Sequence, residues 1–224
     1  MLPMTSLILF AQADVIDDVI EQSWLFWYFN ACGWFFGLLF LLVSIVFVTL
    51  AIMNWLAISR NAIVPQEMIE QFHAKLESKE YQEAFDIAKE SDSVLGRVLA
   101  VGLVKMSTDV ATAEQSINDT AEEEVMRLEH RVNYLGTVAS VSPMLGLLGT
   151  VWGMIDAFNV IAKGTPQAGR IADAIALALV TTQIALLIAI PALVLFEVFK
   201  NRLAQLVLEL DTQIAQVLKQ FKQS

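Results

Sequence analysis

The chain has 224 residues, of which 56% are hydrophobic and only 17% are charged. This balance is unusual for a soluble globular protein and indicates membrane spans. The formal net charge is −10 and no run of basic residues occurs, which argues against nucleic acid as a partner. The single cysteine excludes an internal disulfide, and no cysteine–histidine cluster has metal-site spacing, so we expect no metal and no cofactor. Both histidines are expected to be solvated surface residues.

The N-terminal segment, residues 1–32, is acidic and contains no lysine or arginine. Its apolar LILF run, followed by Ala11, Gln12 and Ala13, is similar to a signal peptide with a small-residue cleavage site. The basic residues that open such a peptide are missing. We therefore expect a short periplasmic amphipathic helix, with cleavage of the segment as the alternative.

Three long intervals of the chain carry no charged residue, and each supplies the roughly 20 residues that a helix needs to cross a bilayer. Tryptophan and tyrosine side chains flank the first interval, as in the aromatic belts of membrane proteins. We predict transmembrane helices at about residues 33–56, 134–161 and 171–197. The expected fold class is an all-α membrane protein, with three transmembrane helices extended into a cytoplasmic helical bundle and residues 33–224 forming one domain.

The positions of lysine and arginine near the span ends predict the orientation. Most of them lie on one side of the predicted spans, at Arg60, Arg127, Arg131, Lys200 and Arg202. The short loop between the second and third spans carries two basic residues, which is a weaker opposing signal. We therefore expect the N-terminus outside, and residues 57–133 and 198–224 in the cytoplasm.

The cytoplasmic region is expected to be helical throughout. Pro65 stands where a helix can begin, and residues 67–91 place their apolar side chains on roughly one helical stripe. Residues 91–106 predict a second helix. Residues 111–135 predict a third, acidic helix that continues without a breaker into the second span.

The C-terminal region after the third span has apolar residues in a heptad pattern, at Leu203, Val207, Leu210, Ile214, Val217 and Phe221. The pattern predicts a helix that packs against other helices. Those helices belong either to the same subunit or to a neighbouring one.

Three glycines occur in the MLGLLGTVWG stretch of the second span, at Gly146, Gly149 and Gly153. Glycine weakens a soluble helix by about 1 kcal/mol relative to alanine, so its repeated use indicates a special requirement. Spacings of three and four residues place these glycines on one face, where small residues let helix backbones approach closely in lipid. The third span has a similar face of alanines, and we include Pro191 among the expected helix-packing positions.

Hydroxyl groups lie near the middle of the second and third spans, at Thr150, Thr181 and Thr182. Because these spans run antiparallel, the threonines can meet at one depth. One interpretation is that each hydroxyl donates to a carbonyl of its own helix. The other is that the threonines line a polar pore, with Ser140 and Ser142 extending the lining toward the cytoplasm.

Two stretches of these spans resemble a known family of membrane proteins. LGTVASVSPMLGLLGTVWGMIDAF, residues 135–158, is similar to the second-span signature of the ExbB/TolQ/MotA proton-channel family. TTQIALLIAIPALV, residues 181–194, is similar to its third-span signature. Three spans and an outside N-terminus are closer to ExbB and TolQ than to MotA, which has four spans and a larger cytoplasmic domain.

The resemblance implies a homo-oligomer, a pentamer in this family, in the bacterial inner membrane. Its pore would enclose the single-span helix of an ExbD-like or TolR-like partner, whose membrane aspartate carries the proton. Force would pass to a TonB-like or TolA-like protein that drives outer-membrane transport or envelope processes. By motif position, Thr150 and Thr182 correspond to the pore-facing threonines of the family.

One position departs from the family pattern, because many ExbB-like members have a glutamate where this chain has Leu177. Asp173, one turn earlier, either takes over that acidic role or is a solvated residue favoured by the dipole at the start of the helix. The choice between proton and sodium therefore stays open, and a non-conducting scaffold around a single-span partner is the alternative function. No nucleophile–base pair or phosphate loop is present in the sequence, so we do not expect an enzyme.

Overall fold

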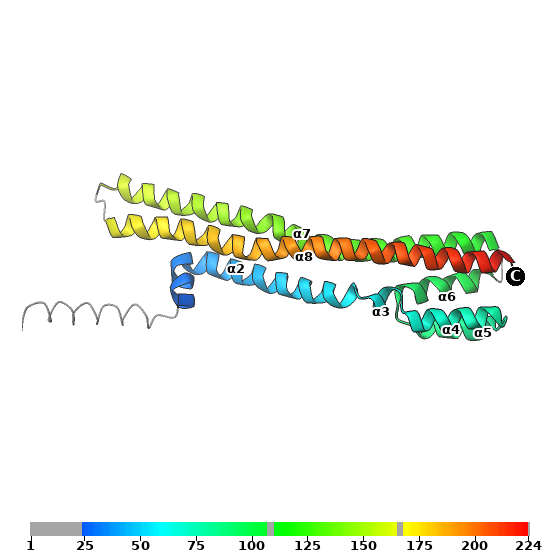
Figure 1. Cartoon of the computed structure of the whole chain (residues 1–224). Coiled ribbons are helices and arrows are strands. Elements are labelled where there is room, and N and C mark those ends of the chain that lie inside the picture. Colours follow the sequence, from blue (N-terminus) through cyan, green and yellow to red (C-terminus); the bar gives the residue numbers. More distant parts are fainter. Residues whose placement is uncertain (1–23, 107–109, 165–167, 224) are drawn as a thin grey trace, which may run out of the picture. The chain divides into compact units, whose positions relative to one another are not determined.

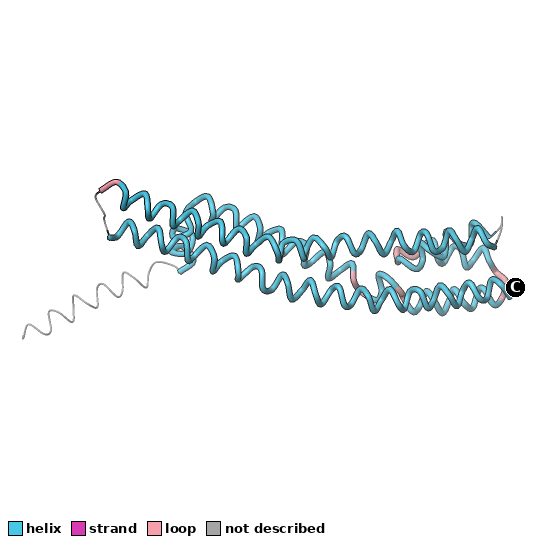
Figure 2. The backbone as a smooth tube through the Cα atoms, turned by 90° about the horizontal axis from the view of Figure 1, so that it is seen from above, coloured by secondary structure: helices cyan, strands magenta, loops and turns pink. Residues whose placement is uncertain are grey.

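The computed structural model describes residues 24–106, 110–164 and 168–223. Figure 1 labels the helices of these ranges in chain order, and Figure 2 shows short loops between them and no strand. The predicted N-terminal helix and its alternative cleavage site lie outside the described residues. The helices are α2 (Trp24–Ala57), α3 (Arg60–Ile63), α4 (Gln66–Glu77), α5 (Tyr81–Glu90), α6 (Val94–Met106), α7 (Val110–Ala162) and α8 (Ala168–Gln223).

Three of these helices are long and apolar enough to cross a membrane. In α2 the apolar part is Gly33–Ala57, and the other two are α7 and α8. The expected all-α membrane fold is therefore confirmed. The predicted acidic helix and the second span form one unbroken helix, α7, and the third span continues into the C-terminal region as α8.

The chain divides into two compact units. The first unit consists of residues up to Ile45 together with Val141–Ala189, and the second of Val46–Ser140 together with Ile190–Ser224. Helices α2, α7 and α8 contribute residues to both units. Each unit has its own apolar core, and each is described separately below.

The core of the first unit joins α2 to α8. Phe36 and Phe40 of α2 are buried together with Val180 and Ala185 of α8. The α2 backbone is kinked at Gly33, whose φ of 72° lies in the left-handed region that a residue without Cβ adopts at no steric cost. The kink divides α2 into two helical segments, and the second of them, Gly33–Ala57, is the part long and apolar enough to cross a membrane.

The core of the second unit contains the C-terminal heptad residues of α8. Leu203, Leu210, Ile214 and Val217 are all buried against residues of the same chain. These heptad residues therefore pack within the subunit, and packing of the same helix against a neighbouring subunit stays a prediction. The side chain of Phe221 lies outside what the structure describes.

The prediction of one continuous stripe over residues 67–91 was wrong, because a turn separates α4 from α5. Lys79 in this turn has a φ of 59°, and the Glu80 amide donates to the carbonyl of Lys75. The chain therefore reverses, and the apolar faces of both helices enter one core, through Phe72 and Leu76 of α4 and Ala84 of α5. No glycine or proline marks this turn in the sequence. The expected start of α4 after Pro65 is confirmed.

The connection between α5 and α6 is fixed by a buried serine. The Ser93 hydroxyl accepts a hydrogen bond from the Gly96 amide at 3.0 Å, as a helix N-cap does. A Cβ atom on Gly96 would lie 2.8 Å from the Ala88 carbonyl oxygen, so the missing side chain lets α6 approach α5 closely.

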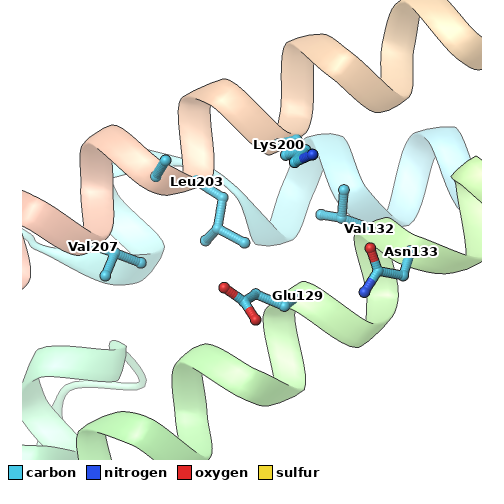
Figure 3. A pocket seen from close by; sticks show the side chains of 7 residues that line it. Glu129, Val132, Asn133, Lys200, Leu203 and Val207 are labelled. Atoms are coloured by element: carbon cyan, nitrogen blue, oxygen red, sulfur yellow. The ribbon is translucent and has the colours of Figure 1, made fainter.

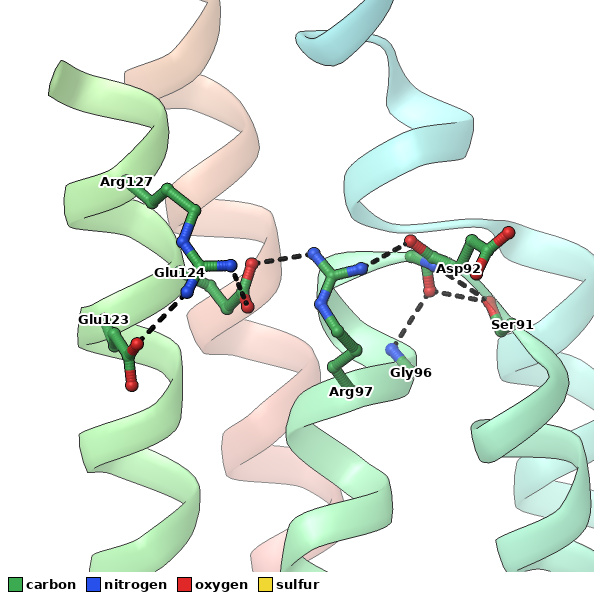
Figure 4. Close-up of polar contacts among 8 residues, drawn as sticks. Ser91, Asp92, Gly96, Arg97, Glu123, Glu124 and Arg127 are labelled. Carbon is green, nitrogen blue, oxygen red and sulfur yellow. Dashed lines mark hydrogen bonds and ion pairs between the residues drawn. The ribbon is translucent and has the colours of Figure 1, made fainter. Parts of the chain in front are cut away.

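An ion-pair network joins α6 to α7 in the second unit (Figure 4). Arg97 donates to the Glu124 carboxylate at 2.7 Å and to the Asp92 carbonyl at 2.7 Å. Arg127 approaches the second Glu124 oxygen at 3.4 Å. The Arg97 hydrogen bond holds the pKa of the buried Glu124 carboxyl below its ordinary value of 4.5, although burial acts in the opposite direction.

Replacing Glu124 by glutamine is expected to destabilise the folded protein at pH 7. The folded-state pKa of Glu124 is lower than its unfolded value, so the stabilisation is present above the unfolded pKa and disappears as pH falls through the folded one. Loss of a hydrogen bond to a charged group costs about 1–3 kcal/mol. The thermal unfolding midpoint of the detergent-solubilised protein, measured from pH 7 down to pH 3, should differ between Glu124→Gln and wild type only at the higher pH values.

The matched control for this measurement is Glu123→Gln. The Glu123 side chain is 72% exposed and pairs with Arg127 at 3.1 Å, so its removal should change stability little. Equal losses for both variants would contradict a specific role for the Arg97–Glu124 pair.

Candidate functional site

The central feature of the first unit is an interface between α7 and α8 made almost entirely of small side chains. Its buried positions recur every three or four residues, which matches the 3.6-residue period of an α-helix. On α7 they are Ser142, Gly146, Gly149, Gly153, Ala157 and Val160, and on α8 they are Ala174, Ala178, Thr181, Ala185 and Ala189. Neither helix contributes a charged or aromatic residue to these positions.

The glycines of α7 lie where the α8 backbone comes closest. A Cβ atom on Gly153 would lie 2.7 Å from the Ala174 carbonyl oxygen, and one on Gly146 would lie 2.5 Å from the Ala185 Cβ. A Cβ atom on Gly149 would overlap the side chain of Thr181. The absent side chains therefore allow the two antiparallel helices to pack at very short range.

The two adjacent threonines of α8 have different surroundings. Thr181 is fully buried, and its hydroxyl donates to the carbonyls of Ala178 at 2.9 Å and Leu177 at 3.0 Å in its own helix. Thr182 is half-buried, and its hydroxyl donates across the interface to the Gly146 carbonyl at 3.1 Å. In a regular helix the Gly146 carbonyl also accepts a hydrogen bond from the backbone amide of Thr150. The Thr182 hydroxyl is therefore a second donor to the carbonyl that bonds Thr150.

The remaining hydroxyls on α7 also differ in exposure. Thr150 is partly exposed, and its hydroxyl donates to the Leu147 carbonyl at 2.6 Å. Ser142 is fully buried. Burial of Ser142 and Thr181 within one chain differs from the expectation that they line a pore, because neither side chain reaches the surface. Thr150 and Thr182 retain exposed area.

A family model described as the MotA/TolQ/ExbB proton channel family matches residues 90–212, which is more than half of the chain. The chain belongs to this family. The match contains most of α7 and α8, including every interface position described above.

Curated relatives agree with this assignment. Over 109 residues the chain is 39% identical to the Tol-Pal system protein TolQ of Haemophilus influenzae, covering 48% of this chain and 46% of that protein. It is 32% identical over 162 residues to the biopolymer transport protein ExbB of Salmonella typhimurium, covering 64% and 66%. It is 29% identical over 197 residues to ExbB of Pseudomonas putida, covering 80% and 59%. The matches thus span about half to two thirds of these relatives.

Leu177 is partly buried, and its side chain lies near Gly33 of α2. The family resemblance suggested a glutamate at this position. The carbonyl of Leu177 accepts the Thr181 hydroxyl. Asp173 is exposed and lies beyond the first turn of α8, which begins at Ala168. Pro191 is exposed within α8 of the second unit, and its role as a helix-packing position stays a prediction.

Two polar side chains in the apolar helices were missed by sequence reasoning. Asn54 in α2 is 1% exposed, and its amide donates to the Leu50 carbonyl at 2.8 Å and to the Arg131 carbonyl of α7 at 3.3 Å. Gln183 is an exposed amide in the uncharged interval of α8. A carboxamide side chain within an uncharged interval is the sequence signal that identifies both residues, because such groups are costly in lipid.

Substitution of Gly149 by alanine is expected to destabilise the first unit strongly, because the new methyl group overlaps the Thr181 side chain close to the α8 backbone. Overpacking of this kind costs about 1–3 kcal/mol. The unfolding midpoint in detergent, followed by circular dichroism, measures the effect.

Gly169→Ala is the control, since a Cβ atom there meets nothing within 4 Å. Gly169 lies at the N-terminal end of α8, and its replacement by alanine should be neutral or slightly stabilising. A Gly149→Ala protein as stable as Gly169→Ala would show that α7 and α8 do not pack as closely as described.

Proposed function

We propose that the chain is the multi-pass channel subunit of an inner-membrane complex of the Ton/Tol type, which uses the proton motive force to drive outer-membrane transport or envelope processes. It acts with an ExbD-like or TolR-like single-span partner and transfers force to a TonB-like or TolA-like protein. Its N-terminus is periplasmic and its C-terminus cytoplasmic. Family membership and the arrangement of α7 and α8 support this proposal.

The observation that carries the proposal is the chemistry of the α7–α8 interface. It presents hydroxyl groups, but residues 132–155 and 174–196 contain no charged side chain. Hydroxyl groups position water or a carboxylate by hydrogen bonding, but they do not themselves ionise near neutral pH. A proton pathway along these helices therefore requires an acidic group from another chain, which a single-span partner with a membrane aspartate supplies.

The outer faces of the first unit are apolar and are compatible with an oligomer around that partner. Large apolar side chains on α7 are exposed, among them Leu147 at 64%, Val151 at 51% and Phe158 at 63%. In a pentamer these faces contact neighbouring copies, the partner helix or lipid. The partly exposed Thr150 and Thr182 then face the partner as the polar groups of the pore.

The second candidate is a scaffold that oligomerises around the same kind of partner without conducting ions. Leu177 favours this candidate, because an apolar side chain stands where the family resemblance suggested a glutamate. Asp173 and Asp156 are both exposed and lie outside the uncharged intervals, so neither replaces a group at mid-membrane depth.

Ion flux into liposomes separates the two candidates. The purified protein is reconstituted with and without the single-span protein encoded beside it, and a pH-sensitive dye inside the vesicles reports flux under an imposed potential. Partner-dependent acidification supports the channel. Absence of proton flux in both preparations contradicts it, and sodium flux in the same vesicles then distinguishes a sodium channel from the scaffold.

The double variant Thr150→Val and Thr182→Val is expected to reduce partner-dependent flux at least tenfold while leaving assembly intact, because valine keeps the shape and removes both hydroxyls. A tenfold change corresponds to about 1.4 kcal/mol, the net worth of a hydrogen bond to a charged group. Thr212→Val is the matched control, since its hydroxyl donates to the Leu208 carbonyl of its own helix in the second unit. Normal flux in the double variant would show that these hydroxyls only satisfy the chain's own backbone.

A further inference from the structure

The C-terminal end of α2 has one fully buried side chain, and that side chain is polar. In the part of α2 that belongs to the second unit, residues 46–57, Asn54 is 1% exposed, whereas every other residue of this stretch is half-buried or exposed. Buried positions of an apolar helix are ordinarily filled by residues such as leucine or valine. The presence of an amide here therefore needs a physical reason.

The Asn54 amide joins α2 to α7 through its donor hydrogens. Its Nδ2 atom donates to the Leu50 carbonyl of α2 at 2.8 Å and to the Arg131 carbonyl of α7 at 3.3 Å. Both acceptors are backbone carbonyls, so only the nitrogen of the amide can face them. The bond to Arg131 is directional, and it forms only when α2 has one rotation and one axial position relative to α7.

The carbonyl oxygen of the same amide gains no bond from this arrangement. Among the described residues no group donates to the Asn54 Oδ1 atom, and the atom is buried from solvent. A buried acceptor without a donor loses its hydration and receives nothing in return. Asn54 therefore makes the folded chain less stable than an apolar side chain of similar shape would.

Removal of the amide would leave no other polar group unpaired. In a regular helix the Leu50 carbonyl also accepts the backbone amide of Asn54, and the Arg131 carbonyl accepts that of Leu135. Both α2 and α7 are continuous helices at these residues. Leucine is similar in shape to asparagine and has the higher helix propensity. Stability alone thus favours leucine at position 54.

The other contacts at this end of α2 define its rotation less well. The Trp55 ring contacts the Phe199 ring edge to face, with centroids 6.3 Å apart, but Trp55 is 62% exposed. Arg60, just beyond α2, pairs with Glu209 of α8, but its side chain is 51% exposed, and exposed ion pairs are weak. Apolar contacts such as those of Leu50 are non-directional, so they allow several settings of the helix.

Polar side chains of α7 on either side of Arg131 are solvated, unlike that of Asn54. Glu129 and Asn133 are exposed and extend from α7 into an open pocket beside α8 (Figure 3). Exposed side chains bond water in any setting of the neighbouring helices, so they impose none. The enclosed amide of Asn54 is satisfied in its donors by one arrangement of α2 and α7.

We propose that Asn54 is a positioning residue that fixes one rotation and axial position of the first span against α7, while lowering the stability of the fold. A lone buried polar residue fixes the register of coiled coils in the same way. Helix α7 also carries Thr150, so its setting against α2 affects transport under the proposed function. That consequence for transport rests on the proposed function, and the positioning role itself does not.

The effect on stability is tested with Asn54→Leu in the full chain in detergent at pH 8. Its thermal unfolding midpoint should equal or exceed that of the wild type, because the unpaired acceptor disappears and no partner is left unpaired. Asn54→Asp has the same shape but places a carboxylate against two carbonyls, so its midpoint should fall by several degrees. A midpoint for Asn54→Leu clearly below that of the wild type would overturn the inference that the amide lowers stability.

The setting of α2 is measured by double electron–electron resonance between spin labels at Ile52→Cys on α2 and Tyr134→Cys on α7. Cys32, the one native cysteine, is replaced by serine. The two label sites are 56% and 61% exposed and belong to the second unit. Labelled chains are diluted with unlabelled ones, so that the distance within one chain dominates. With Asn54 present the distribution should be narrow, and in Asn54→Leu it should become at least twice as wide or gain a second maximum.

Two further variants show whether the bond to α7 is responsible. Asn54→Thr keeps a hydroxyl that bonds a carbonyl of its own helix but does not reach Arg131, so it should broaden the distribution as leucine does. Asn118→Leu, at an exposed position of α7 in the second unit, is the control and should leave the distribution unchanged. An unchanged distribution in Asn54→Leu, or equal broadening in Asn118→Leu, would overturn the positioning role.

Partner-dependent proton flux gives the functional readout. Asn54→Leu should reduce this flux at least threefold while the unfolding midpoint is retained, a combination that a merely structural residue does not give. Normal flux together with a broadened distance distribution would overturn the consequence for transport. Absence of flux in the wild type, with the distance pattern intact, would contradict the proposed function alone.

Discussion

The short-range contact between α7 and α8 at Gly146, Gly149 and Gly153 is the constraint on which the first unit depends. Lipid tails are as apolar as leucine, so burial of large apolar side chains does not hold two membrane helices together. Van der Waals contact between backbones does, and it requires that no Cβ atom intervene. The large side chains are consequently placed on the other faces of these helices, where lipid, another copy or a partner helix must cover them.

The same contact determines what the hydroxyl groups do. It brings the Thr182 hydroxyl to the Gly146 carbonyl on the opposite helix, while the Thr181 hydroxyl, one residue earlier, remains bonded within α8. Polar atoms in the interface are therefore satisfied by the backbone of this chain without any ionisable side chain. The interface supplies close packing and hydrogen-bonding capacity, and its buried positions include no side chain that ionises near neutral pH.

Sequence reasoning predicted the features that depend on composition and period. Uncharged intervals predicted the three long apolar helices, glycine spacing predicted a common face, and Pro65 predicted the start of α4. It missed the turn at Lys79, because a non-glycine residue with positive φ leaves no compositional signal. It also did not separate Thr181 from Thr182, since adjacent residues differ by about 100° around a helix and only the pairing of α7 with α8 decides which one is buried.

The two units differ in the polar side chains that α7 and α8 carry. The α7–α8 interface of the first unit holds hydroxyl groups and no charge, whereas α7 and α8 of the second unit also carry charged and amide side chains. In the first unit the threonine hydroxyls donate to backbone carbonyls, so they have little freedom to distinguish one ion from another. In the second unit Glu129, Asn133 and Lys200 line a pocket of about 410 Å³. Discrimination between proton and sodium requires a titrating or coordinating group, and under the proposed function that group belongs to the partner, because the α7–α8 interface of this chain supplies only hydroxyls.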